Sequence, residues 1–159
     1  MEWSPARPGG SLPGAVLFAC TLNRVRSPIA AGLMRRLFGR RLHVDSCGLR
    51  TSPAGGDPNP FVVAAMDEVG VDLGAHQPKT FADLEDDSFD VVISLTPEAQ
   101  HRAVEMARRR SVELEYWPTL DPTLAGGSRE QILATYREVR DELERRIRAR
   151  FPLAATFGG

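Results

Sequence analysis

Apolar and polar positions divide this chain into short apolar runs separated by segments with helical periodicity. Residues 15–20 (AVLFAC) and 89–95 (FDVVISL) are nearly continuous apolar runs, typical of strands that are buried on both faces. Residues 42–47 (LHVDSC) form a third strand candidate. Residues 112–117 (VELEYW) alternate, which favours a fourth strand nearer the sheet edge.

Helix signals follow each of the first three strand candidates. Ser27-Pro28 predicts a helix start with Ser27 as N-cap and Pro28 at the first helical position, and Gly39 is a plausible stop. Asn59-Pro60 and Thr96-Pro97 carry the same start signature. Strands that alternate with helices predict parallel pairing, with helices on both faces of the sheet.

A long last helix is predicted from one apolar face, formed by Ile132, Tyr136, Val139, Leu143 and Ile147. Its outer face offers i,i+4 ion pairs: Asp141–Arg145, Glu142–Arg146 and Glu144–Arg148. The chain of 159 residues favours one domain, which we place at residues 15–151. The Pro- and Gly-rich residues 1–14 are predicted to be a disordered N-terminal tail, and residues 152–159 a short C-terminal tail.

Composition limits the cellular compartments and the binding partners that we expect for this protein. A formal net charge of −1 argues against an electrostatic nucleic-acid binder, and no apolar run has membrane-spanning length. Two cysteines are too few for a secreted disulfide scaffold, so we expect a soluble cytoplasmic protein with reduced thiols. Residues 108–110 (RRR) suggest a nucleic-acid or acidic-partner patch, or more simply complement the negative end of a helix dipole.

The loop CTLNRVRS, residues 20–27, joins the first strand to the first helix. Ligands of open α/β sheets bind beyond the carboxyl ends of strands, and a helix N-terminus favours anions. The same positive field, with Arg26 nearby, stabilises a thiolate on Cys20. A lone cysteine at a strand end is usually a small buried hydrophobe. Its place between a buried strand and a helix start favours a nucleophile, with Arg26 as a two-pronged phosphate clamp.

The segment VLFACTLNRVRSP resembles the phosphate-binding loop of low-molecular-weight protein tyrosine phosphatases, C-x5-R-S-P after an apolar strand. The resemblance implies a four-stranded parallel sheet and hydrolysis through a phosphocysteine on Cys20, without metal or cofactor. It implies that Asp121, followed by Pro122, acts as general acid and then as base. The phosphate-binding residues would then be Thr21, Leu22, Asn23, Arg24, Val25, Arg26 and Ser27.

The resemblance also implies supporting roles for residues around this loop. Asn23 would hold a left-handed turn, a conformation that Asn tolerates well. Ser27 would donate its hydroxyl toward the Cys20 thiolate. Ser46 and His76 match positions that hydrogen-bond the loop asparagine. The implied substrate is a phosphorylated protein or a small phosphomonoester, and we expect a monomer or weak dimer that binds neither nucleic acid nor membrane.

Three departures from the family pattern bear on regulation and specificity. Val25 replaces a second cysteine that can protect the nucleophile as a disulfide, and Cys47 is better explained as a packed strand residue than as its substitute. Residues 123–125 (TLA) and Ser52 stand where many members carry aromatic residues. Trp117 could line the substrate slot, or it could belong to the core.

Two other functions fit the same loop. The first is arsenate reduction, because thiol-coupled arsenate reductases share this fold and loop. Those enzymes use further cysteines that residues 94–106 lack, so this chain would need an external thiol partner. The second is a non-catalytic phosphate- or oxyanion-binding regulator.

Overall fold

A computed structural model describes residues 12–52, 57–85, 88–151 and 153. The tail predicted at residues 1–14 therefore lies mostly outside the described residues, as does most of the tail predicted at 152–159. Leu12 and Leu153 pack against the core, and the Gly14 carbonyl accepts a hydrogen bond from the backbone N–H of His43 at 2.9 Å.

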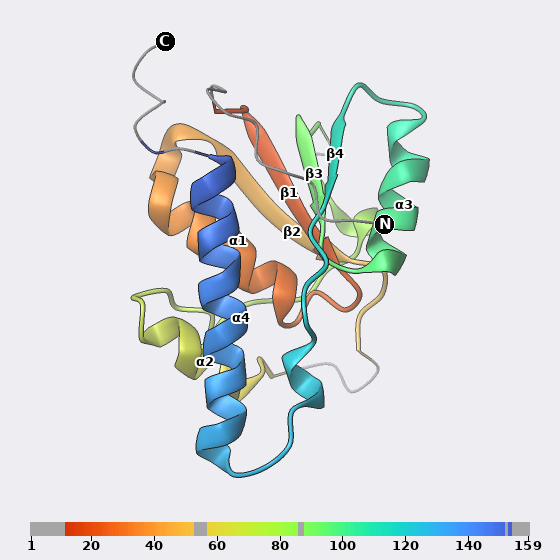
Figure 1. The fold of residues 1–159 in the computed structure, drawn as a ribbon. Coiled ribbons are helices and arrows are strands. Elements are labelled where there is room, and N and C mark those ends of the chain that lie inside the picture. Colours follow the sequence, from red (N-terminus) through yellow and green to blue (C-terminus); the bar gives the residue numbers. More distant parts are fainter. Residues whose placement is uncertain (1–11, 53–56, 86–87, 152, 154–159) are drawn as a thin grey trace.

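The strands form one parallel four-stranded sheet in the order β2-β1-β3-β4 (Figure 1). They are β1 (Ala15–Cys20), β2 (His43–Gly48), β3 (Val91–Ser94) and β4 (Glu113–Tyr116). The two central strands are those with the continuous apolar runs, and the alternating strand is at an edge, as predicted. Helices exclude water from both faces of the central strands, so both faces there must be apolar.

Helices cover both faces of the sheet, as the sequence pattern predicted. α1 (Arg26–Phe38) and α4 (Arg129–Arg150) pack together on one face, with α2 (Pro60–Asp67) against α4, and α3 (Pro97–Ala107) covers the other face (Figure 1). Short 3₁₀ segments, η1 (Gly39–Arg41), η2 (Phe81–Asp83) and η3 (Pro122–Leu124), lie in the connections. The protein is thus a single-domain α/β fold.

The core consists of two layers, one on each face of the sheet. Alternate residues of β1 point to opposite layers: Phe18 and Cys20 face α1 and α4, whereas Leu17 and Ala19 face α3. Trp117 is 1% exposed and meets the Phe18 ring edge-on at 6.0 Å between centroids, so it is a core residue and no wall of a substrate slot.

Most predicted helix signals are confirmed, with a correction at Ser27-Pro28, because Pro28 is the third residue of α1 rather than the first. The Asn59 side chain accepts from the N–H groups of Phe61 and Val62, and Thr96 accepts from Ala99. Gly39 has φ +59° and follows the last residue of α1. α1 starts at Arg26 after Val25, which makes no side-chain cap. Ser27 is no N-cap because its hydroxyl is engaged with Cys20 and Asn23.

The ion pairs on α4 also differ partly from the prediction. Glu142–Arg146 and Glu144–Arg148 form, at 3.1 and 3.0 Å. Arg145 pairs with Glu142 instead of Asp141, because Asp141 accepts from the neighbouring Arg140 at 2.8 Å. Among the described residues, no helix combines the length and apolar character needed to cross a membrane.

Candidate active site

Cys20 ends β1 at the carboxyl edge of the sheet, and the loop that follows leads directly into α1 (Figure 1). A pocket of about 370 Å³ opens here. Its lining comes from this loop, the start of α3 and the segment before α4, namely Cys20, Thr21, Leu22, Arg24, Val25, Arg26, Thr96, Pro97, Glu98, Asp121 and Thr123. Within the described part of the chain, no group accepts a hydrogen bond from the backbone N–H groups of residues 22–25. These N–H groups are therefore available to an oxyanion.

Asn23 holds the loop from behind. It has φ +55°, is fully buried, and has all of its side-chain bonds inside the protein. Its Nδ2 donates to Ser27 Oγ at 2.8 Å and to Ser46 Oγ at 2.9 Å, and its Oδ1 accepts from the Lys79 backbone N–H at 3.0 Å. The side chain thus ties the loop to α1, to β2 and to the segment before η2.

His76 holds the same turn through the main chain. Its Nε2 lies 2.8 Å from the Asn23 carbonyl, so this nitrogen carries the proton and donates it. Burial lowers the pKa of His76, and the bond to the carbonyl opposes that shift only in part. The neutral imidazole is therefore the resting form. Ser46 and His76 lie behind the loop, and neither lines the pocket.

Ser27 connects this support to the thiol. Its Oγ lies 2.9 Å from Cys20 Sγ and accepts from Asn23, whereas its contact with the Cys47 carbonyl is longer at 3.4 Å. The proton of Ser27 has two possible acceptors, the Cys20 sulfur and the Cys47 carbonyl, and the shorter contact is the one with the sulfur. A hydroxyl so placed stabilises a thiolate on Cys20.

Gly48 allows β2 to pass close beneath the loop. A Cβ at this position would lie 2.8 Å from the Asn23 nitrogen and 2.8 Å from the Thr21 carbonyl oxygen. The Thr21 carbonyl also accepts from the Leu49 N–H at 2.8 Å. The close approach is therefore with backbone atoms, which cannot move aside as a flexible side chain would.

Arg26 and Asp121 meet across the pocket, although they are far apart in the sequence. Arg26 Nη2 lies 3.8 Å from Asp121 Oδ2, with exposed side-chain fractions of 17% and 31%. Arg26 Nη1 donates to the Thr119 carbonyl at 3.1 Å, which directs the guanidinium. Asp121 Oδ1 accepts from the Thr123 N–H and hydroxyl at 3.0 and 2.6 Å. Oδ2 is thus the oxygen that faces the pocket.

Most of the other residues predicted for the site line this pocket, and Pro122 does not. Thr21, Leu22 and Arg24 line the pocket, and Arg24 Nη2 donates to the Asp57 carbonyl at 3.1 Å. Val25 lines the pocket but is mostly buried in the core, and Pro122 is buried in η3.

Cys47 and the nucleophile lie on opposite faces of the sheet. Its side chain packs in the layer that faces α3, whereas the Cys20 side chain packs in the layer that faces α1. Burial, the first of several causes, raises the pKa of the Cys47 thiol well above its usual range. This thiol is a packed core residue, and the two cysteines are both free. Across the described ranges, no group of three or more His, Cys, Asp or Glu is placed to hold a metal ion.

Sequence reasoning missed several groups that shape the site. Thr96 and Glu98, at the start of α3, line the pocket, and Thr21 Oγ1 lies 3.4 Å from Glu98 Oε2. The Thr-Pro helix start after the third strand was a signal for these residues. Parallel strands all end at the same edge of the sheet, so the start of this helix lies near the end of β1. Thr119 and Lys79 act through backbone groups. Because nearly every residue type has these groups, the side chains of these two residues give no sequence signal.

Comparisons with known proteins agree with this geometry. Residues 15–151 match the family model described as low molecular weight phosphotyrosine protein phosphatase. The glutaredoxin arsenate reductase of Synechocystis sp. is 30% identical over 83% of this chain and 92% of its own. A low molecular weight protein tyrosine phosphatase from Bacillus subtilis is 27% identical, with a TM-score of 0.63 over 85% of this chain and 93% of its own.

A third relative is YwlE from Bacillus subtilis. A mutant of it is 27% identical, with a TM-score of 0.67 over 89% of this chain and 95% of its own. Another matching structure describes YwlE as an arginine phosphatase. These relatives share one fold but differ in the reactions that their names state.

Proposed function

Since the chain belongs to the low molecular weight phosphotyrosine protein phosphatase family, we propose that it hydrolyses phosphomonoesters, with phosphotyrosine on protein as the substrate. One observation supports this above the others: Cys20, Arg26 and Asp121 line a single pocket, with Asp121 Oδ2 at 3.8 Å from Arg26 Nη2. A nucleophile, a phosphate clamp and a carboxyl group are the three parts that this chemistry needs.

The first step transfers the phosphoryl group to sulfur. The phosphate oxygens lie against the N–H groups of residues 22–25 and the Arg26 guanidinium, which stabilise the charge of the transition state. The Cys20 thiolate attacks phosphorus, the S–P bond forms, and the P–O bond to the leaving group breaks. Asp121 gives the proton on Oδ2 to the departing oxygen, so an alcohol or phenol leaves.

The second step hydrolyses the phosphocysteine. A water molecule attacks phosphorus, and the Asp121 carboxylate accepts its proton. The S–P bond breaks, inorganic phosphate is released and Cys20 leaves as a thiolate. The Ser27 hydroxyl, 2.9 Å from the sulfur, stabilises that leaving thiolate. Asp121 ends the cycle protonated, as it began.

A protein substrate is favoured by the exposed surroundings of the acid. Leu120 and Leu124 flank Asp121 and are 64% and 81% exposed, although both are large apolar residues. Leu22 and Pro97 add apolar groups to the pocket wall, in place of aromatic ones. We propose that these aliphatic groups pack on the phenol ring and on neighbouring residues of the substrate protein.

The test is hydrolysis of para-nitrophenyl phosphate by the wild-type protein and Cys20→Ser, under reducing conditions with a chelator. We expect activity in the wild type that vanadate inhibits, none in the variant, and binding of vanadate by both. A wild type that binds vanadate without hydrolysing any ester would favour the oxyanion-binding regulator. Phosphotyrosine and phosphoarginine peptides of one sequence then compare the two leaving groups.

Arsenate reduction is the second candidate, favoured by the 30% identity to a glutaredoxin arsenate reductase. Cys20 would attack arsenate and expel hydroxide. An external thiol, of the glutaredoxin or mycothiol type, would then attack the Cys20 sulfur. The S–As bond breaks with its electrons passing to arsenic, which gives arsenite and a mixed disulfide. A further external thiol would reduce that disulfide.

The external thiol is required here because Cys47 packs on the opposite face of the sheet. The test measures arsenite formed from arsenate with glutaredoxin and glutathione, or with mycothiol. Arsenite formed faster with the wild type than with Cys20→Ser would support this activity. No difference between the two proteins would exclude these thiols as partners.

A further inference from the structure

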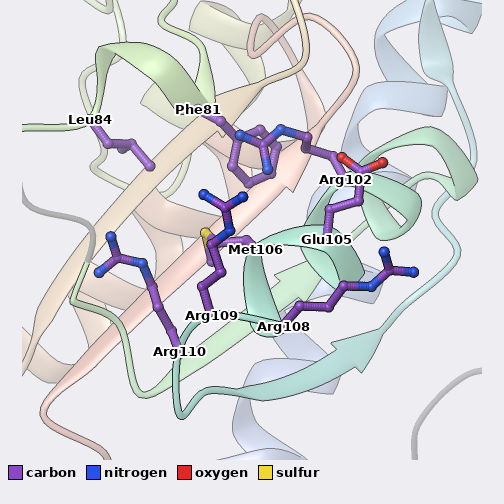
Figure 2. Close-up of a pocket in the computed structure, with 8 residues that line it drawn as sticks. All are labelled: Phe81, Leu84, Arg102, Glu105, Met106, Arg108, Arg109 and Arg110. Atoms are coloured by element: carbon purple, nitrogen blue, oxygen red, sulfur yellow. The ribbon is translucent and has the colours of Figure 1, made fainter.

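A second hollow lies away from the catalytic pocket, between η2 and the end of α3 (Figure 2). Its volume is about 560 Å³, within the range of ligand sites. Its lining has four arginines and one acid, with apolar residues beneath: Arg102, Arg108, Arg109, Arg110, Glu105, Phe81, Leu84 and Met106. We call it the basic hollow.

Two of its arginines are well placed to bind an anion. The Arg102 guanidinium carbon lies 5.1 Å from the centre of the Phe81 ring, which orders that side chain. Figure 2 shows the Arg109 side chain extending toward Leu84 and Phe81. Within the described part of the chain, neither arginine forms an ion pair with a carboxylate.

The arginines of α4 provide a contrast. From Arg137 onward each one pairs with a carboxylate, as shown by Arg137, Arg140, Arg145, Arg146, Arg148 and Arg150. Compensation of the helix dipole explains the arginines that follow the end of α3 at Ala107, but Arg102 lies in the middle of that helix. The basic hollow therefore holds more positive charge than its own helix requires.

One face of α3 connects the basic hollow with the catalytic pocket. Glu98 lines the catalytic pocket, and Arg102 lies four residues later on the same face. Met106 continues that face four residues later, and Arg109 lies in the turn that follows α3, three residues after Met106. At helical spacing, α3 and the turn after it cover roughly 16 Å from Glu98 to Arg109, a distance that about five residues of extended peptide span.

We propose that the basic hollow binds an acidic segment of the substrate protein, about five residues from the phosphorylated residue. This inference rests on the proposed phosphatase activity. Guanidinium groups bind carboxylates through paired hydrogen bonds. Leu84 and Met106 provide an apolar surface on which the methylene groups of the substrate's acidic side chains can pack. A nucleic acid fits less well, because Phe81 is 9% exposed beneath Arg102 and offers no free face to a base.

The experiment compares two peptides with one phosphotyrosine each. One carries glutamates four to seven residues away, on both sides, and the other carries glutamines there. We expect the wild type to have about tenfold higher kcat/KM for the acidic peptide at low salt, and a smaller preference at high salt. Arg102→Gln/Arg109→Gln should lose the preference and retain para-nitrophenyl phosphate hydrolysis.

Two controls make the result specific. Arg145→Gln/Arg148→Gln removes the same charge from exposed positions of α4 and should keep the preference. Arg109→Gln alone, which leaves Arg102 on Phe81, should lose part of it. Equal kcat/KM for the two peptides, or an equal loss in the α4 variant, would overturn the proposal.

Direct binding separates this proposal from the proposed activity. The unphosphorylated acidic peptide, followed by fluorescence anisotropy, should bind the wild type more tightly than Arg102→Gln/Arg109→Gln. If para-nitrophenyl phosphate is not hydrolysed but this difference persists, the activity fails and the anion site stands. Tighter binding of a single-stranded oligonucleotide, lost in the same variant, would assign the hollow to nucleic acid instead.

Discussion

The catalytic loop has two sides that are built differently. Behind it, Asn23 is fully buried and its side chain makes three hydrogen bonds within the protein. In front, Asp121 is partly exposed, and its Oδ2 lies 3.8 Å from Arg26. The back fixes the conformation of the loop, whereas the front keeps groups available for substrate. We therefore expect changes behind the loop to alter stability and activity together, and changes in front to alter activity alone.

The largest effect is expected in front of the loop, from Asp121→Asn. The amide cannot give up a proton, so hydrolysis of esters with poor leaving groups should fall about 10²–10⁴-fold. Activated aryl esters should lose much less, because their leaving groups need little protonation. The measurement is kcat for a series of aryl phosphates, with thermal unfolding as the control. Equal losses across the series would assign the acid role to another group.

The next largest effect is expected behind the loop, at Asn23. Asn23→Gly keeps the left-handed conformation but removes three buried hydrogen bonds, at a cost of about 2–4 kcal/mol in unfolding free energy. Asn23→Ala should lose about 1–2 kcal/mol more, because alanine is strained in that conformation. Urea unfolding and kcat measure the two consequences. A stable, inactive Asn23→Gly protein would break the proposed division between the two sides.

Gly48→Ala tests the close approach of β2 without removing a hydrogen-bonding group. Its methyl group would meet backbone atoms of Thr21 and Asn23 at 2.8 Å, so the loop must shift. We expect a loss of about 1–3 kcal/mol, typical of overpacking, and a lower kcat. Gly126→Ala is the matched control, since nothing lies within 4 Å of its added Cβ. Similar losses in both variants would refute the importance of this contact.

The smallest effect concerns pH and His76. Its pKa is lowered from 6.5 by burial, so the unfolded chain binds more protons than the folded protein as pH falls below about that value. The free energy of unfolding should therefore decrease as the pH falls from 7.5 to 5.5. Glu68 and Glu142, whose pKa values are lowered by arginine partners, become protonated below this range. His76→Gln should reduce this slope. His101→Gln, at a site whose side chain is 84% exposed, is the matched control.

Local sequence patterns were enough to predict the order of the elements and the parts of the catalytic loop. Continuous apolar runs identified the central strands because burial on both faces leaves no polar side. The cap residues Asn59 and Thr96 determined where their helices begin, since their side-chain oxygens accept from N–H groups two or three residues ahead. The loop CTLNRVRS combined a cysteine and an arginine at the spacing of the family pattern.

The contacts that those residues make depend on packing between distant segments. Ser27 has the sequence signature of an N-cap, but the packing of Asn23 and Cys20 against its hydroxyl assigns it to the thiol. Asp121 and Asp57 both precede proline, and only Asp121 lies in the pocket. Sheet order and helix packing determine the positions of Glu98 and Arg102 on α3. They also determine the positions of the backbone groups of Thr119 and Lys79. Contacts between distant segments depend on how those segments pack in three dimensions, which local sequence patterns do not encode.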